Sequence, residues 1–188
     1  SWETGGQERA KIPLQKAMAH IARIPEKERY LVRAQEANIY RGYEASVAVL
    51  REMEKLYSNE KEMLYNIGDW SYHANDLVVA AQYLEKVLAM DPTMERALEH
   101  LSWTYRDSEQ HDRFLDIARR YATASGSNEA YNLLGTAYRR KGDYDNAMKT
   151  FKQLRDLFPK NYAIVSQIAQ TYMDLGNFRE AEKELKKL

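Results

Sequence analysis

The 188-residue chain contains no cysteine, which excludes disulfides, thiol nucleophiles and thiolate-bound metals. Its 28 basic residues are balanced by 28 acidic ones, so it lacks the positive excess that favours nucleic acid binding. The longest apolar run, residues 77–81, is too short to span a bilayer, and we see no secretory signal. These features do not determine the cellular compartment of the protein, and we favour the cytoplasm. Because the chain starts at Ser1 and its last predicted helix stops at Leu188, we expect a fragment of a longer protein.

Proline and glycine are also few, and their positions indicate the organisation. Pro25, Pro92 and Pro159 are separated by 67 and 67 residues, twice a period of about 33.5, which is typical of helical repeats. The same period relates three tyrosines that we assign to the core between helices, Tyr105, Tyr138 and Tyr172. Several residue types therefore share one repeat.

Residues 128–159 show the unit most clearly. Tyr131, Leu134 and Tyr138 fall on one face of a helix, and a second amphipathic stretch follows after a turn at Gly142. The pattern predicts a helical hairpin. Gly135 lies inside the first helix, where glycine is unfavourable, so we expect the facing helix to approach it closely.

These residues resemble the tetratricopeptide repeat. The pattern of large, Leu, Gly, aromatic, Gly, aromatic, Ala, aromatic and Pro residues is carried by Tyr131, Leu134, Gly135, Tyr138, Gly142, Tyr144, Ala147, Phe151 and Pro159. The resemblance covers residues 27–188 and implies an all-α, right-handed solenoid of stacked antiparallel helix pairs, about five repeats plus an N-terminal helix. We expect a disordered tag or linker at 1–7 and a helix or partial repeat at 8–26, interrupted or started late by Pro13. The expected repeats are 27–60, 61–94, 95–127, 128–161 and 162–188.

The third repeat, 95–127, departs from the pattern. It has Glu109 where the turn glycine would stand, and we expect its second helix to be irregular. A further, weaker resemblance is to the tetratricopeptide tails of multidomain bacterial signalling and regulatory proteins. It is carried by residues 24–29, 56–57, 91–92 and 100–101.

In the proteins that this sequence resembles, fixed positions of each first helix line a concave groove. Carried over, the resemblance predicts a partner-binding set of Tyr65, Asp69, Tyr72, His73, Trp103, Arg106, Asn132, Arg139, Arg140 and Met173. A peptide or protein segment with an apolar anchor and an acidic group would suit them. Tyr65 and Trp103 could equally lie in the core, and the basic run 139–141 is most simply a solvated helix end.

Other functions find less support in the sequence. The Lys and Asn residues with which some tetratricopeptide proteins clamp chaperone tails are missing at the matching positions. Asp69 and His73 are two potential metal ligands, which is too few to hold an ion, and we see no catalytic or phosphate-binding motif. We therefore predict a non-catalytic scaffold for a protein partner, with no cofactor, metal, nucleic acid or membrane insertion. The alternative is an accessory or oligomerisation domain of a kinase, cyclase or DNA-binding regulator, which could self-associate through Phe178, Ala181 and Leu185 on its last helix.

Overall fold

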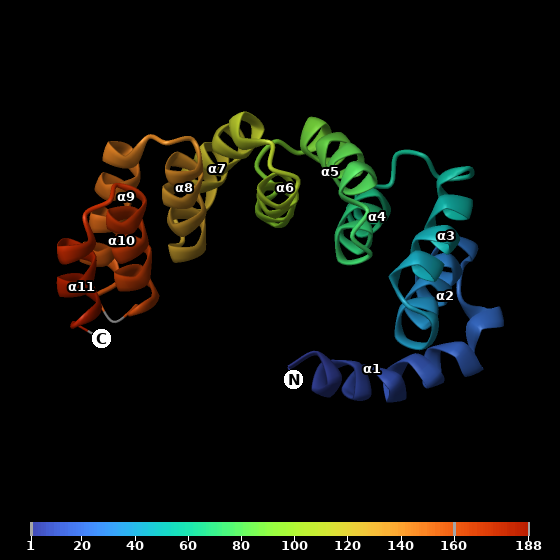
Figure 1. Ribbon diagram of the computed structural model, residues 1–188. Coiled ribbons are helices and arrows are strands. Elements are labelled where there is room, and N and C mark those ends of the chain that lie inside the picture. The colour runs from blue at the N-terminus through green and yellow to red at the C-terminus, as the bar shows by residue number, and fades with distance from the viewer. Residues whose placement is uncertain (1, 160, 188) are drawn as a thin grey trace. The chain divides into compact units, whose positions relative to one another are not determined.

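The structure, a computed structural model, describes residues 2–159 and 161–187, with side chains from residue 10 onward. The described residues are helical with no β-strand, and the chain divides into unit 1, Ser1–Pro92, and unit 2, Thr93–Leu188 (Figure 1). Unit 1 contains α1 (Trp2–Ala19), a short 3-10 helix (Ile21–Arg23), α2 (Glu26–Arg41), α3 (Tyr43–Glu54), α4 (Lys61–His73) and α5 (Leu77–Met90). Unit 2 contains α6 (Glu95–Asp107), α7 (His111–Ser125), α8 (Asn128–Arg140), α9 (Tyr144–Leu157), α10 (Ala163–Asp174) and α11 (Phe178–Leu185).

Each unit is a stack of helical hairpins. The pairs α2–α3 and α4–α5 form the hairpins of unit 1, and α6–α7, α8–α9 and α10–α11 form those of unit 2. The second helix of a hairpin also packs on the first helix of the next, as α3 does on α4 and α9 on α10. This arrangement confirms the all-α repeat predicted from the period of the sequence. None of the described helices is both long and apolar enough to cross a bilayer.

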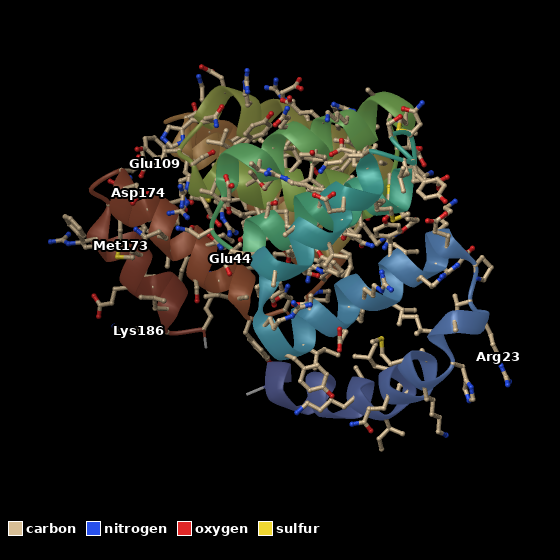
Figure 2. All side chains as sticks on the ribbon, turned by 90° about the vertical axis from the view of Figure 1, so that its right-hand side faces the viewer. Arg23, Glu44, Glu109, Met173, Asp174 and Lys186 are labelled. Atoms are coloured by element: carbon tan, nitrogen blue, oxygen red, sulfur yellow. The ribbon has the colours of Figure 1, made fainter. Side chains whose placement is uncertain are left out.

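Four first helices end in the same type of turn. The second residue after the helix has a positive φ in each case, 62° at Asn75, 57° at Glu109, 77° at Gly142 and 73° at Gly176. The next residue then donates its N–H to a carbonyl five residues earlier, as Gln110 does to Tyr105 at 3.0 Å. This is the Schellman motif, in which glycine is strongly favoured. Glu109 therefore occupies a position whose backbone suits glycine (Figure 2).

Replacing Glu109 with glycine is expected to stabilise unit 2 by about 1 kcal/mol, because it removes the penalty of a side chain in the left-handed region. Urea unfolding of the two proteins would measure the difference. The reciprocal substitution Gly142→Ala, made at the equivalent turn, should destabilise the unit by a similar amount. A Glu109→Gly protein no more stable than the wild type would show that the turn is not strained.

Two expectations about individual helices are wrong. Helix α1 is continuous from Trp2 to Ala19 and contains Pro13, so the proline neither interrupts nor delays the helix. A single proline or glycine lowers helix propensity without forbidding the helix. The second helix of the third repeat, α7, is continuous over 15 residues, because buried Phe114, Ile117 and Tyr121 keep its apolar face in register.

Close packing inside the hairpins explains the glycines within first helices. A Cβ atom built on Gly68 would lie 2.7 Å from Leu84 Cγ, and one built on Gly135 would lie 2.5 Å from Phe151 Cε1. In the third repeat the equivalent positions hold Ser102 and Ala118, both fully buried. A small residue is thus paired with a large one in two hairpins, whereas the third combines two residues of modest size.

The tyrosines that share one repeat position lie where the sequence predicts. Tyr105 is 3% exposed, and Tyr138 and Tyr172 pack against the core cluster around Phe151 and Ile168.

Candidate peptide-binding surfaces

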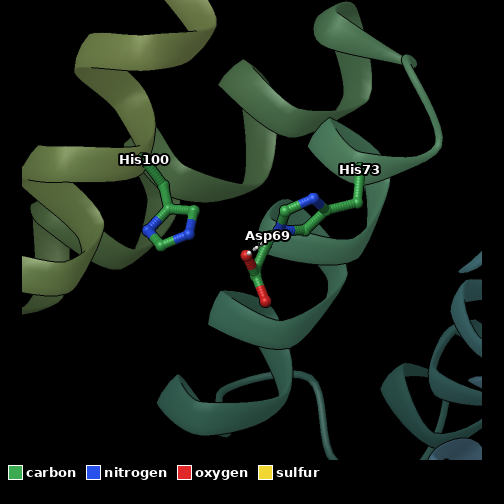
Figure 3. A group of neighbouring side chains, drawn as sticks. All are labelled: Asp69, His73 and His100. Carbon is green, nitrogen blue, oxygen red and sulfur yellow. Dashed lines mark ion pairs between the residues drawn. The ribbon is translucent and has the colours of Figure 1, made fainter. Parts of the chain in front are cut away.

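In unit 1, three of the predicted contact residues gather at the end of α4. The imidazole of His73 stacks on the ring of Tyr43 from α3, with centroids 5.1 Å apart, and meets the edge of Tyr72 at 5.4 Å. Its Nε2 atom lies 3.4 Å from Asp69 Oδ1, an ion pair when the imidazole is protonated (Figure 3). Asp69, Tyr72 and His73 therefore form one cluster with Tyr43, which the sequence analysis did not single out.

The fourth predicted residue of unit 1, Tyr65, belongs to the core. Its side chain is only 5% exposed, so it cannot serve as an open contact for a partner. Successive residues of a helix are rotated by about 100°, and Tyr65 follows directly after buried Leu64. A large ring at the boundary between the two faces of a helix covers neighbouring apolar surface, and the repeat position alone does not predict this.

In unit 2, the predicted residues Trp103, Asn132, Arg139 and Met173 lie on the first helices α6, α8 and α10. Together with Glu99 of α6, we call them the unit 2 face. Helix α8 contacts both α6 and α10. Trp103 is half-buried, and its ring lies 4.6 Å from that of His100 on the same helix. Met173 is 36% exposed at the end of α10, beside Asp174 (Figure 2).

Arg139 connects two helices of this face. Its Nη1 donates to Asp174 Oδ2 at 3.2 Å and its Nη2 donates to Gln167 Oε1 at 3.3 Å. The Nε atom is buried and has no hydrogen-bond acceptor among the described residues. The guanidinium is therefore held in place with one donor unsatisfied.

Glu99 supplies negative charge at the α6 end of the face. Burial raises the pKa of its carboxyl, the neighbouring His100 lowers it, and the negative charge of Glu129 on α8 raises it further. Tyr121, which hydrogen-bonds Glu99, also has a raised pKa, mainly because it is buried. A cationic group brought close to Glu99 would reverse these effects and favour the ionised carboxylate.

The remaining arginines of the predicted set have other partners. Arg106 forms two hydrogen bonds with Asp107, Nε to Oδ1 at 2.7 Å and Nη2 to Oδ2 at 3.1 Å. Arg140 donates from Nη1 to the carbonyl of Arg106 at 3.0 Å, and Lys141 pairs with Asp112. The run 139–141 is therefore not simply a solvated helix end, because each of its three residues binds a different neighbour.

Two residues that the sequence analysis missed hold the predicted ones. Tyr43 lies 30 residues before His73, and Gln167 lies 28 residues after Arg139, so each makes its contact about one repeat away in the chain. Stacking of Tyr43 on His73 has no signal in a single sequence.

Comparisons with known proteins agree with this architecture. Two family models described as tetratricopeptide repeat match residues 41–95, 96–162 and 138–188. No curated protein sequence matches the chain. Among solved structures, the crystal structure of MamA protein superposes with a TM-score of 0.78 at 20% identity, covering 86% of this chain and 88% of MamA. A MamA fragment from Desulfovibrio magneticus RS-1 gives a TM-score of 0.79 at 20% identity, covering 87% and 93%. With family models matching most of its length, the chain belongs to the tetratricopeptide repeat family.

Proposed function

We propose that the protein is a non-catalytic scaffold that binds a peptide segment of a partner protein on the unit 2 face. As a tetratricopeptide repeat protein, it belongs to a family of protein-interaction scaffolds. The observation that carries the proposal is the connected surface of α6, α8 and α10. There, a half-buried tryptophan and a partly exposed methionine lie beside charged groups. Such surfaces are typical of helical repeats that bind extended or helical segments.

The chemistry of the face favours one kind of segment. Trp103 offers a large, rigid ring, the residue type most enriched among energetically dominant contacts. The Nη atoms of Arg139 have exchangeable acceptors in Asp174 and Gln167, so a partner carboxylate could replace these acceptors. We therefore expect an aliphatic or aromatic anchor against Trp103 and an acidic group toward Arg139.

A selection from displayed random peptides on the immobilised protein would test the proposal. Enriched peptides would be synthesised and titrated calorimetrically against the wild type, Trp103→Ala and Arg139→Gln. We expect Trp103→Ala to weaken binding by about 10-fold or more. Arg139→Gln should weaken acidic peptides more than neutral ones.

The control is Lys152→Ala, an exposed position on the second helix α9, which should bind like the wild type. Circular dichroism would establish that all variants keep their helix content. If the peptides bind Trp103→Ala and wild type equally, or if Lys152→Ala alone weakens them, the unit 2 face is not the binding surface.

The exposed side of α11 favours a second candidate function, self-association. Leu185 is 42% exposed, whereas Leu50, Leu84, Ala118 and Phe151, at the same position of earlier repeats, are fully buried. Phe178 on the same helix is 69% exposed, whereas Ala181, which we expected on the same surface, is buried in the core. If a second copy covers this side, the sedimentation coefficient will rise with protein concentration, and Phe178→Glu will abolish the rise. Concentration-independent sedimentation of a monomer would eliminate this function.

A further inference from the structure

A second surface of unit 2 has a different chemistry from the unit 2 face. It is a depression of about 490 Å³ between the turn that joins α6 to α7 and the end of α8. The residues that line it all carry a polar or charged group: Glu109, Gln110, His111, Asp112, Arg113, Arg140 and Lys141. A space of this size, lined in this way, suits a small charged group better than an apolar side chain.

The cations of the depression come from two separate elements. Arg113 belongs to the first turn of α7, whereas Arg140 and Lys141 stand at the end of α8. Hydrogen bonding to the carbonyl of Arg106 anchors the guanidinium of Arg140, and its remaining N–H groups are not used by that bond. Three cations thus border the space, against the two carboxylates of Glu109 and Asp112.

The contact between Asp112 and Lys141 shows what the depression can hold. The side chain of Asp112 is 89% exposed, yet its carboxylate pairs with the Lys141 ammonium, and this hydrogen bond lowers its pKa. An exposed ion pair of this kind contributes little to stability and exchanges readily. The Asp112 carboxylate therefore lies at the edge of the depression, in a position that an anionic group of a ligand could take.

The start of α7 adds further donors. Helices α5 and α9 are capped by Asp76 and Asp143, which accept from the N–H groups of Val79 and Asn146 at 3.2 Å each. At α7 the capping position is Gln110, whose side chain makes no such bond. Without a side-chain cap, the first turn of α7 favours an anion.

We propose that this depression binds a phosphoryl group. Its anchors are Arg140 and Lys141 from α8, together with Arg113 and the first turn of α7. A phosphoryl group offers more acceptor oxygens than a carboxylate, which matches donors that converge from two elements. The site is separate from the unit 2 face and does not depend on peptide binding there.

The test is an NMR titration of the isotopically labelled protein with inorganic phosphate, at an ionic strength held constant with sodium chloride. We expect saturable shifts of the amide signals of residues 110–113. Lys141→Gln and Arg140→Gln should each weaken binding by about 5-fold, because each removes one contact cation.

The Asp112→Asn variant distinguishes a phosphate-binding role of the depression from a purely structural role of its residues. It should strengthen phosphate binding by about 2-fold, because it removes a competing carboxylate from an exposed position. The matched control is Asp116→Asn, an exposed residue of α7 that does not line the depression, and its affinity should equal that of the wild type. The unchanged spectrum of α6 and α9 would show that each variant is folded.

Titrations with other ligands identify the source of the phosphoryl group. Tighter binding of a phosphoserine peptide than of inorganic phosphate supports a site for phosphorylated protein, and the reverse supports a site for free phosphate. Acetate that binds as tightly as phosphate overturns the phosphoryl assignment. Shifts that do not saturate, or that Lys141→Gln leaves unchanged, overturn the site itself.

Discussion

Replacing Gly135 with alanine is expected to destabilise unit 2 by about 2 kcal/mol. The added methyl group gains about 1 kcal/mol of intrinsic helix preference, and it would stabilise an open helix. Here the Cβ atom would lie 2.5 Å from Phe151 Cε1 and 2.7 Å from Cζ, and Phe151 is fully buried. Overpacking of a rigid core costs about 1–3 kcal/mol, and a contact this short falls at or beyond the upper end of that range. The steric cost therefore exceeds the gain in helix preference.

Hydrogen exchange of the α8 and α9 amides would measure the change, because it reports the opening free energy of unit 2 rather than of the whole chain. The third repeat supplies the control, since it holds Ser102 and Ala118 at these two positions. Phe151→Ala alone should cost about 3–5 kcal/mol through the cavity that it leaves. The double variant Gly135→Ala with Phe151→Ala should lose about 2 kcal/mol less than the sum of the two single variants. A stabilised Gly135→Ala protein, or strictly additive losses, would refute the packing argument.

The Tyr83→Phe protein is expected to lose about 1.5 kcal/mol of stability in unit 1. The hydroxyl of Tyr83 donates to Glu54 Oε2 at 2.5 Å, and the tyrosine is only 7% exposed. A hydrogen bond to a charged acceptor contributes about 1.5–3 kcal/mol, and Lys86, 3.4 Å from Glu54, keeps the remaining carboxylate partly compensated. The loss should therefore fall near the lower end of that range.

The same contact predicts a change at alkaline pH. Burial, followed by the bond to Glu54, raises the pKa of Tyr83 to about 12 from the ordinary value of 10.0. The folded state thus favours the neutral phenol. Its stabilising effect is complete below pH 10 and is lost as the pH rises toward 12. Urea unfolding followed by circular dichroism should show a gap between wild type and Tyr83→Phe that is constant up to about pH 9 and closes above pH 10. A gap that is absent at neutral pH, or that widens in alkali, would contradict this account.

The repeat period predicted the fold well because several residues of each hairpin face the same neighbours. Tyr105, Tyr138 and Tyr172 lie in or against the core, and Gly135 faces Phe151 as its place inside a helix implied. The turn at Glu109 could not be recognised from its residue type, because hydrogen bonds of the surrounding helices hold a glutamate in a glycine conformation.

The candidate site was harder to predict than the fold. Position within the repeat placed Trp103, Arg139 and Met173 on the first helices of unit 2, but it did not distinguish an open side chain from an engaged one. Tyr65 lies in the core, and Arg140 borders the depression beside α7. Such differences depend on contacts between neighbouring hairpins, which a pattern within one hairpin does not contain.

The ion pairs between hairpins make the order of the repeats matter. Among the described residues, Lys27 pairs with Glu60, Lys86 with Glu54, Asp112 with Lys141, Arg139 with Asp174 and Arg155 with Glu184, all about one repeat apart. The positions equivalent to Arg139 and Asp174 one repeat earlier hold Arg106 and Arg140, two like charges. A chain with its hairpins shuffled would keep the same composition and the same zero net charge. Its oppositely charged residues would nevertheless no longer face each other across adjacent hairpins. The ion pairs therefore favour one order of hairpins, which the shared hydrophobic pattern alone does not distinguish.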